Sequence, residues 1–121
     1  MKKRRKFSAA WSPEREITAE ITWLEEGVHV LLVGGRSHVG AISYAQNGHV
    51  QGYQAMGHKE QTISDSWAKG LSVYWSCPVT VCCGIHYDEI SKEEIQRIVN
   101  TCEELLQRIW TEETYWERNE K

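Results

Sequence analysis

The sequence lacks any uninterrupted apolar run of the roughly 18 residues that a helix needs to cross a bilayer. It also lacks internal repeats and low-complexity segments, and no apolar stretch follows its basic start at residues 2–6. That start therefore does not have the pattern of a secretory signal. We expect a single cytoplasmic domain without membrane association, because 121 residues with 40% hydrophobic and 26% charged side chains are typical of one globular unit.

Cysteine is sparse, and its four copies form no C-x-x-C pair. Cys82 and Cys83 are adjacent, so a strand would place them on opposite faces. In a cytosolic protein they stay reduced, and we expect them to pack as small hydrophobic side chains. The alternative is that Cys83 acts as a nucleophile, since it stands just before a glycine-marked turn.

Basic residues are few outside the start of the chain. The formal net charge is −3, and without the five basic residues at positions 2–6 nine basic face 17 acidic side chains. An acidic body argues against nucleic-acid binding, which depends on neutralising phosphates. We predict a basic, disordered tail over residues 1–12, a single domain over 13–112 and a charged end over 113–121. Contact of the tail with nucleic acid or anionic lipid remains the alternative.

Hydrophobic periodicity predicts the strands. Apolar residues alternate with polar ones over residues 17–23, which indicates a half-buried strand. The almost wholly apolar run 28–33 indicates a central strand. Asn47-Gly48 is a strong hairpin signal, so it separates strands at 39–45 and 49–54. A further short strand is expected at 79–85.

Two helices follow from helical spacing. Ile63, Trp67 and Leu71 recur on one face of a helix expected over residues 59–72. A second helix over 91–110 begins with the capping box Ser91-Lys92-Glu93-Glu94. It then carries one apolar stripe. Six tryptophans are many for this length, and we expect some of them to line an exposed groove or a dimer interface. Core packing is the simpler account for Trp67 and Trp110.

The order of elements is thus β-β-β-β-α-β-α. Strands joined by hairpins and followed by amphipathic helices indicate an α+β fold. We expect an antiparallel sheet with both helices packed on one of its faces.

Three histidines lie in short glycine-marked turns, at residues 34–40 (GGRSHVG), 57–60 (GHKE) and 84–88 (GIHYD). Loops on a rigid scaffold are where binding residues concentrate. Arg36 in the first turn offers a donor fork suited to phosphate or carboxylate, and a tight strand connection with an exposed arginine is the alternative that the local sequence favours. The second turn opens the first predicted helix, where free amides attract anions, so an anion site and an ordinary helix start both remain open. Asp88 in the third turn could orient His86 or simply form the turn.

The catalytic alternatives have weaker support. The glycine spacing is not that of a dinucleotide fingerprint, and no serine stands in a strained elbow. His38, His58 and His86 together could hold a catalytic zinc, although no short ligand spacing supports it. A small metal-assisted enzyme, or an accessory subunit of a decarboxylase, therefore stays as a second hypothesis.

Taken in order, the segments 34–41, 57–60 and 84–88, followed by Glu93-Glu94-Ile95, resemble the LpdD-like family of prenylated-flavin chaperones. These small proteins accompany UbiD-type decarboxylases, which use prenylated FMN. The resemblance spans about residues 15 to 110. Val39, Met56 and Cys83 depart from the pattern, and Cys83 would add a thiol near a redox-active flavin.

The resemblance implies a fold similar to that of proteasome-assembly chaperones, commonly dimeric. It implies a protein that is not an enzyme, but binds prenylated FMN (or FMN) and stores it or passes it to a UbiD-type decarboxylase. A homodimer is expected. Separately, Tyr44 or Trp75 is a candidate to stack on the flavin ring. A chaperone of protein assembly without a ligand is the third hypothesis. The expected cofactor-binding residues are Gly35, Arg36, His38, Gly40, Gly57, His58, Lys59, Glu60, His86 and Asp88.

Overall fold

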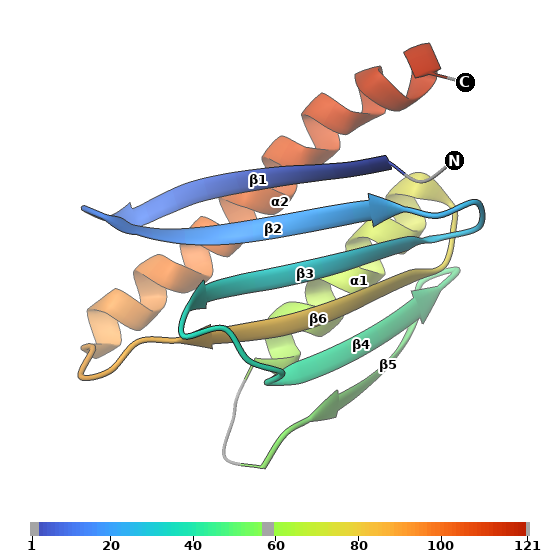
Figure 1. The fold of residues 1–121 in the computed structure, drawn as a ribbon. Coiled ribbons are helices and arrows are strands. Elements are labelled where there is room, and N and C mark those ends of the chain that lie inside the picture. The colour runs from blue at the N-terminus through green and yellow to red at the C-terminus, as the bar shows by residue number, and fades with distance from the viewer. Residues whose placement is uncertain (1–2, 57–59, 121) are drawn as a thin grey trace.

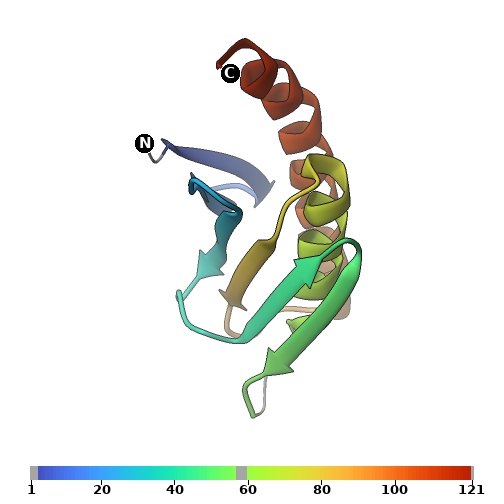
Figure 2. The ribbon, with the colours of Figure 1, turned by 90° about the vertical axis from the view of Figure 1, so that its right-hand side faces the viewer.

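A computed structural model of the chain describes residues 3–56 and 60–120, with side chains as far as residue 112. One six-stranded sheet carries two helices on a single face (Figures 1 and 2). The predicted α+β class and the placement of both helices on one face are confirmed. The elements are β1 (Lys3–Ser12), β2 (Arg15–Trp23), β3 (Val28–Gly35), β4 (Ala41–Gln46), β5 (His49–Gln54), α1 (Gln61–Trp75), β6 (Val79–His86) and α2 (Lys92–Glu120).

The sheet is mixed rather than wholly antiparallel. Its strand order is β1-β2-β3-β6-β4-β5, and β6 lies between β3 and β4. The pair β3–β6 is parallel, whereas the other four pairs are antiparallel. The antiparallel prediction is therefore wrong for this pair, because α1 precedes β6 and a helical crossover allows a strand to return in the same direction.

The disordered tail predicted for residues 1–12 is wrong for residues 3–12. They form β1, which pairs with β2 from Lys3↔Trp23 onward. Phe7 and Trp11 alternate into the core and are only 2% and 5% exposed, while Arg4 points outward. The count of basic residues concealed this alternation, and burying two aromatic side chains stabilises the strand in spite of its charge.

The local signals within the chain are confirmed. Asn47 and Gly48 both have positive φ, 54° and 79°, as the two central residues of a tight hairpin turn require. At the start of α2, the Glu94 N–H donates to Ser91 Oγ at 3.1 Å, and Glu94 Oε1 accepts the Ser91 N–H at 2.9 Å. The backbone angles of the hairpin and the capping bonds of α2 are local, which explains why both elements were recognisable without tertiary information.

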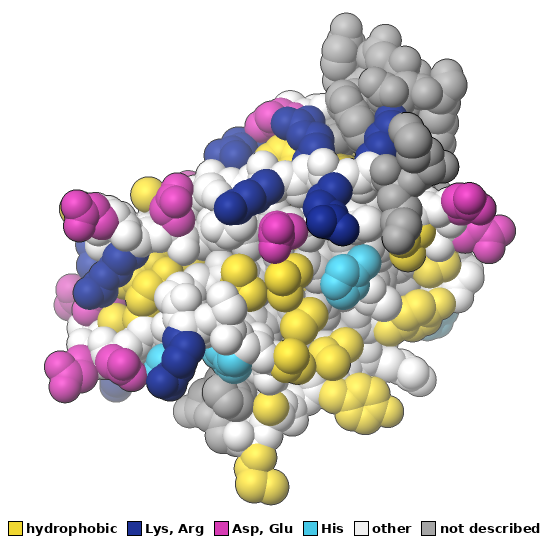
Figure 3. Space-filling model, viewed as in Figure 1, with side chains coloured by type: hydrophobic (Ala, Val, Ile, Leu, Met, Phe, Trp, Pro, Cys, Tyr) yellow, Lys and Arg dark blue, Asp and Glu magenta, His cyan; other side chains and the backbone are white. Residues whose placement is uncertain are grey.

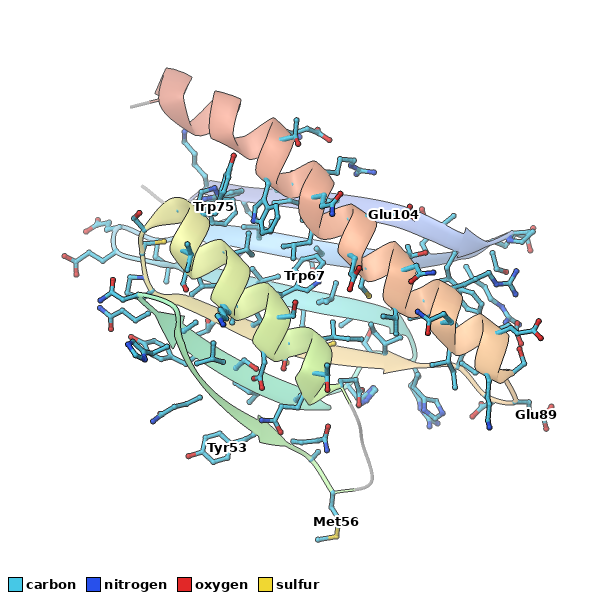
Figure 4. All side chains as sticks on the ribbon, turned by 180° about the vertical axis from the view of Figure 1, so that it is seen from behind. Tyr53, Met56, Trp67, Trp75, Glu89 and Glu104 are labelled. Atoms are coloured by element: carbon cyan, nitrogen blue, oxygen red, sulfur yellow. The ribbon has the colours of Figure 1, made fainter. Side chains whose placement is uncertain are left out.

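The tryptophans pack in or against the core instead of lining a groove. Trp67 is 1% exposed between α1 and the sheet (Figure 4). Trp23 and Trp75 contact each other, with ring centroids 5.5 Å apart, and Trp110 stacks on Tyr74. With Trp11, these are the five tryptophans whose side chains are described, and none is exposed. Core packing is thus confirmed for Trp67 and Trp110, and the expectation of a tryptophan-lined groove is wrong for the other three.

The other face of the sheet carries no helix. Hydrophobic side chains gather there over β4, β5 and β6, while Lys and Arg side chains lie toward β1 (Figure 3). Ile42, Tyr44 and Tyr53 are 45%, 43% and 77% exposed. Among the described residues, neither helix combines the length and apolar character of a membrane span.

Candidate functional site

Two of the three histidine turns meet at one end of the sheet. The parallel pair β3–β6 places Gly35 opposite His86. The Arg36 N–H donates to the His86 carbonyl at 3.0 Å, and the Gly40 N–H donates to the Cys83 carbonyl at 3.0 Å. Both ends of the connection between β3 and β4 are thus bonded to β6, and His38 lies within that connection.

The second turn contributes Glu60, which directly precedes α1. Glu60 Oε2 lies 2.8 Å from His38 Nε2 and accepts the Ile85 N–H at 3.2 Å. Three segments that are distant in sequence therefore share one carboxylate. Gly57, His58 and Lys59, also expected in the site, lie outside the described residues.

Two glycines make this convergence possible. A Cβ atom on Gly84 would lie 1.6 Å from the carbonyl oxygen of His38. A Cβ atom on Gly40 would lie 2.2 Å from Glu60 Oε2. Both positions require the close approach that only glycine permits.

The two histidines present adjacent ring edges. The His38 and His86 centroids are 6.2 Å apart in an edge-on arrangement, and their side chains are 20% and 35% exposed. His86 Nε2 lies 2.9 Å from Asp88 Oδ1, and this hydrogen bond lowers the pKa of Asp88, with a smaller contribution from Arg36. Arg36 and Asp88 are exposed. The site therefore offers imidazole, guanidinium and carboxylate groups to solvent.

The start of α1 is less available to an anion than its sequence indicates. The Gln61 N–H donates to Gln54 Oε1 at 3.1 Å, and the N–H groups of Ile63 and Ser64 donate to the Glu60 carbonyl. These amides already have partners within the chain. In the described part of the site, the exposed cation is Arg36, which can bind a phosphate through two parallel hydrogen bonds.

Cys83 is not placed as a nucleophile. Its side chain is buried in the core, and burial is the main reason that its pKa is raised above the usual range of a thiol. Because the thiolate is the reactive form, this environment disfavours attack by Cys83. Cys82 lies on the opposite face, as the strand alternation predicts.

The two aromatic residues expected to stack on a flavin are placed differently. Trp75 ends α1, whereas Glu60 precedes it, so about 20 Å of helix separates Trp75 from the site. Tyr44 lies on the open face, where its hydroxyl donates to Gln46 Oε1 at 3.0 Å. The stacking role of Trp75 is therefore wrong, and that of Tyr44 stays a prediction.

Exposed apolar residues border the site, a feature that the sequence did not reveal. The Ala55 N–H donates to the Gly40 carbonyl at 2.8 Å, which brings the end of β5 beside the connection between β3 and β4. Val39 is 60% exposed and Met56 98% exposed (Figure 4). Both had stood out only as departures from the family pattern, and no hydrophobic periodicity marks them. Arg36 and the imidazole edges supply polar contacts, and Val39 and Met56 supply apolar surface. These groups suit a phosphate ester that also carries an apolar ring system.

A metal site has no support in the described part of the chain. No group of three or more His, Cys, Asp or Glu side chains there is arranged to hold an ion. His58, the third histidine of that hypothesis, lies outside the described residues.

Comparisons with known proteins agree with this architecture. A family model described as a prenylated flavin chaperone LpdD-like domain matches residues 12–113. Among solved structures, a chain from a novel chaperone complex for yeast 20S proteasome assembly is similar with a TM-score of 0.66. Its sequence identity is 13%, and the match covers 92% of this chain and 97% of that one, so it shows the fold alone. No curated protein matches the sequence.

Proposed function

Because the chain belongs to the prenylated flavin chaperone LpdD-like family, we propose that it binds prenylated FMN without turnover and delivers it to a UbiD-type decarboxylase. The observation that carries this proposal is the meeting of His38, His86 and Arg36 at one end of the sheet, beside exposed apolar side chains. FMN supplies a phosphate and a flat ring system, and its prenylated form adds a further apolar ring.

Each part of the site has a proposed role. Arg36 neutralises the phosphate, together with His58 and Lys59 of the second turn. The exposed edges of His38 and His86 flank the ring system, and Asp88 keeps His86 in place through the 2.9 Å contact. Gly35, Gly40 and Gly57 allow the backbone to approach the ligand or its neighbours. Cys83 has no catalytic role in this proposal, since its thiol is buried.

The direct test is titration of the purified protein with reduced prenylated FMN and, separately, with FMN under anaerobic conditions. We expect saturable binding of prenylated FMN at one site per chain, followed by activation of an apo-decarboxylase on mixing. Arg36→Ala should weaken binding about tenfold or more, because a charge-assisted hydrogen bond contributes roughly 1.5–3 kcal/mol. Arg97→Ala, on the exposed surface of α2, is the matched control.

Absence of binding to either flavin would contradict the proposal and favour a chaperone of protein assembly that has no ligand. Turnover of a substrate by the isolated protein, with stoichiometric metal that is lost in His86→Ala, would instead favour the metal-assisted enzyme. A chain that binds flavin but never activates a decarboxylase would retain the binding role and contradict the delivery role.

A homodimer in the cytoplasm is the proposed working form. The helix-free face of the sheet supports self-association, because Ile42 and Tyr53 pair across β4 and β5 and are both exposed. Exposed apolar patches of this kind often mark interaction surfaces. Sedimentation equilibrium should give twice the mass of 14.0 kDa, and Tyr53→Glu should lower it toward the monomer. A monomer at all concentrations would exclude the dimer, and cell fractionation tests the location.

A further inference from the structure

Glu60 stands where a helix-capping residue would stand, but its side chain does not cap the helix. It precedes α1 with φ −83° and ψ −4°, and no side-chain cap hydrogen bond is present. Its carbonyl oxygen accepts the N–H groups of Ile63 and Ser64 instead. The carboxylate is therefore available for another role, and its burial needs an explanation because buried carboxylates are unfavourable unless they are paired.

The carboxylate is enclosed by the protein itself. Its side chain is 10% exposed, with His38 Nε2 at 2.8 Å and the Ile85 N–H at 3.2 Å. The missing Cβ atom of Gly40 leaves the space that the carboxylate occupies. Little of Glu60 remains for a ligand to touch, although the sequence placed it among the ligand-binding residues.

The contacts of the two ring nitrogens of His38 indicate where its protons lie. Its Nδ1 is 2.9 Å from the Arg36 carbonyl, which only accepts, so Nδ1 carries a proton. Nε2 lies 2.8 Å from the carboxylate oxygen in a close contact that is not aligned as a hydrogen bond. This proximity favours a proton on Nε2, because two lone pairs so close would repel each other. The pair is then an imidazolium and a carboxylate, and its total charge is zero. Such compensation is what makes a buried charge tolerable.

Other ionisable groups surround this pair. His86 lies edge-on to His38, with Asp88 and Arg36 on its solvent side. Cys83 lies behind it, and Glu60 adds to the rise in the pKa of that thiol that burial mainly causes. The His38–Glu60 contact is thus the link between the connection of β3 to β4, the start of α1 and the end of β6.

We infer that Glu60 is a positioning residue: its buried carboxylate holds the His38 ring, in one protonation state and orientation, against the end of β6. The inference rests on the proposed function only in that the ring so held faces the flavin. A carboxylate that orients a binding histidine is a recurring arrangement, and at metal sites its loss costs 10- to 100-fold in affinity.

Glu60→Gln tests this role because glutamine keeps the size of the side chain and an oxygen for the Ile85 N–H, but removes the charge. In spectra of protein labelled with ¹⁵N at histidine, wild-type His38 should show both ring nitrogens protonated. In Glu60→Gln the signals should move to those of a neutral ring protonated at Nδ1. Prenylated-FMN affinity should fall about tenfold, while unfolding in urea stays cooperative. Glu104→Gln, the same change at an exposed position of α2 (Figure 4), should alter neither quantity.

The outcomes separate the two proposals. If wild-type protein binds no flavin, the proposed function is wrong, and the His38 ring signals still decide the positioning role. If wild-type protein binds flavin and Glu60→Gln leaves both the affinity and the ring signals unchanged, the positioning role is wrong. If the variant does not fold, the wild-type spectrum decides: a His38 ring protonated at only one nitrogen would overturn the inference.

Discussion

The two ends of the parallel pair β3–β6 are built from opposite kinds of contact. At the end where both strands begin, Trp23 and Trp75 pack against each other beside the core. At the end where both strands finish, polar atoms of His38, Glu60 and His86 meet over glycine backbone. Apolar packing is nondirectional and tolerates small shifts, whereas hydrogen bonds require particular distances and angles. The aromatic end should therefore govern stability, and the histidine end should govern geometry and binding.

Gly84→Ala, at the histidine end, should give the largest loss of stability. Its Cβ atom would lie 1.6 Å from the His38 carbonyl oxygen, a backbone atom that no rotamer change can move away. We expect a loss of about 3 kcal/mol in the free energy of unfolding, the upper range for overpacking, measured by urea denaturation. Flavin binding should be lost as well. An unchanged midpoint would mean that β6 and the connection between β3 and β4 separate more easily than the structure indicates.

Trp75→Ala should break the aromatic end and leave the site intact. Truncation of a fully buried tryptophan costs about 3–5 kcal/mol, and Trp75 is only partly buried, so about 2 kcal/mol is expected. The ring signals of His38 and His86 should not change. Val73→Ala, at a side chain of α1 that is 60% exposed, is the control and should stay within about 0.5 kcal/mol of wild type. Altered histidine signals in Trp75→Ala would show that the two ends are coupled.

Ser91→Ala should have a smaller effect, at the helix start that follows the histidine end. It removes the acceptor of the Glu94 N–H, and the Ser91 N–H then remains as the only partner of the Glu94 carboxylate in the capping box. We expect about 1 kcal/mol of destabilisation. The pKa of Glu94, which the Ser91 backbone bond holds below its ordinary value, should rise in part. Ser66→Ala, exposed within α1, should not destabilise the protein.

His86→Ala should have the smallest effect on stability and a clear effect on titration. The His86 hydrogen bond holds the pKa of Asp88 below its ordinary value. Since the pKa is lowered in the folded protein, this interaction is present above the ordinary carboxyl range and is lost as pH falls through the lowered value. In ¹³C-detected titrations the pKa of Asp88 should rise in His86→Ala and stay low in His29→Ala. No rise would assign the lowering to Arg36 instead.

The sequence predicted the local elements well where one signal was enough. The hairpin at Asn47-Gly48 and the capping box at Ser91 depend on residues within four positions of each other. The strand β1 was missed because its charge masked the alternation of Phe7 and Trp11. The parallel pairing of β6 with β3 was missed because strand order depends on contacts between segments some fifty positions apart.

The site divides in the same way. The three glycine-marked turns were visible as a pattern, since glycine, histidine and charged residues recur at the ends of predicted strands. Their meeting was not visible, because it depends on the parallel register of Gly35 with His86 and on the reach of Glu60 to His38. The interpretation of Glu60 differs for this reason. Its position in the chain indicated a ligand contact, whereas its burial against His38 indicates a positioning role.

By itself, the sequence determined the α+β class, the hairpin, the capped second helix, the resemblance to flavin chaperones and which side chains could form a site. These depend on backbone preferences and on periodicity, which act over a few residues. Only the tertiary structure decided that β1 completes the sheet, that Trp11, Trp23 and Trp75 pack in or against the core, and that a ring nitrogen of His38 contacts Glu60. Those outcomes depend on burial and on contacts between distant segments. These interactions stabilise the protein only after folding has brought the segments together at a cost in chain entropy.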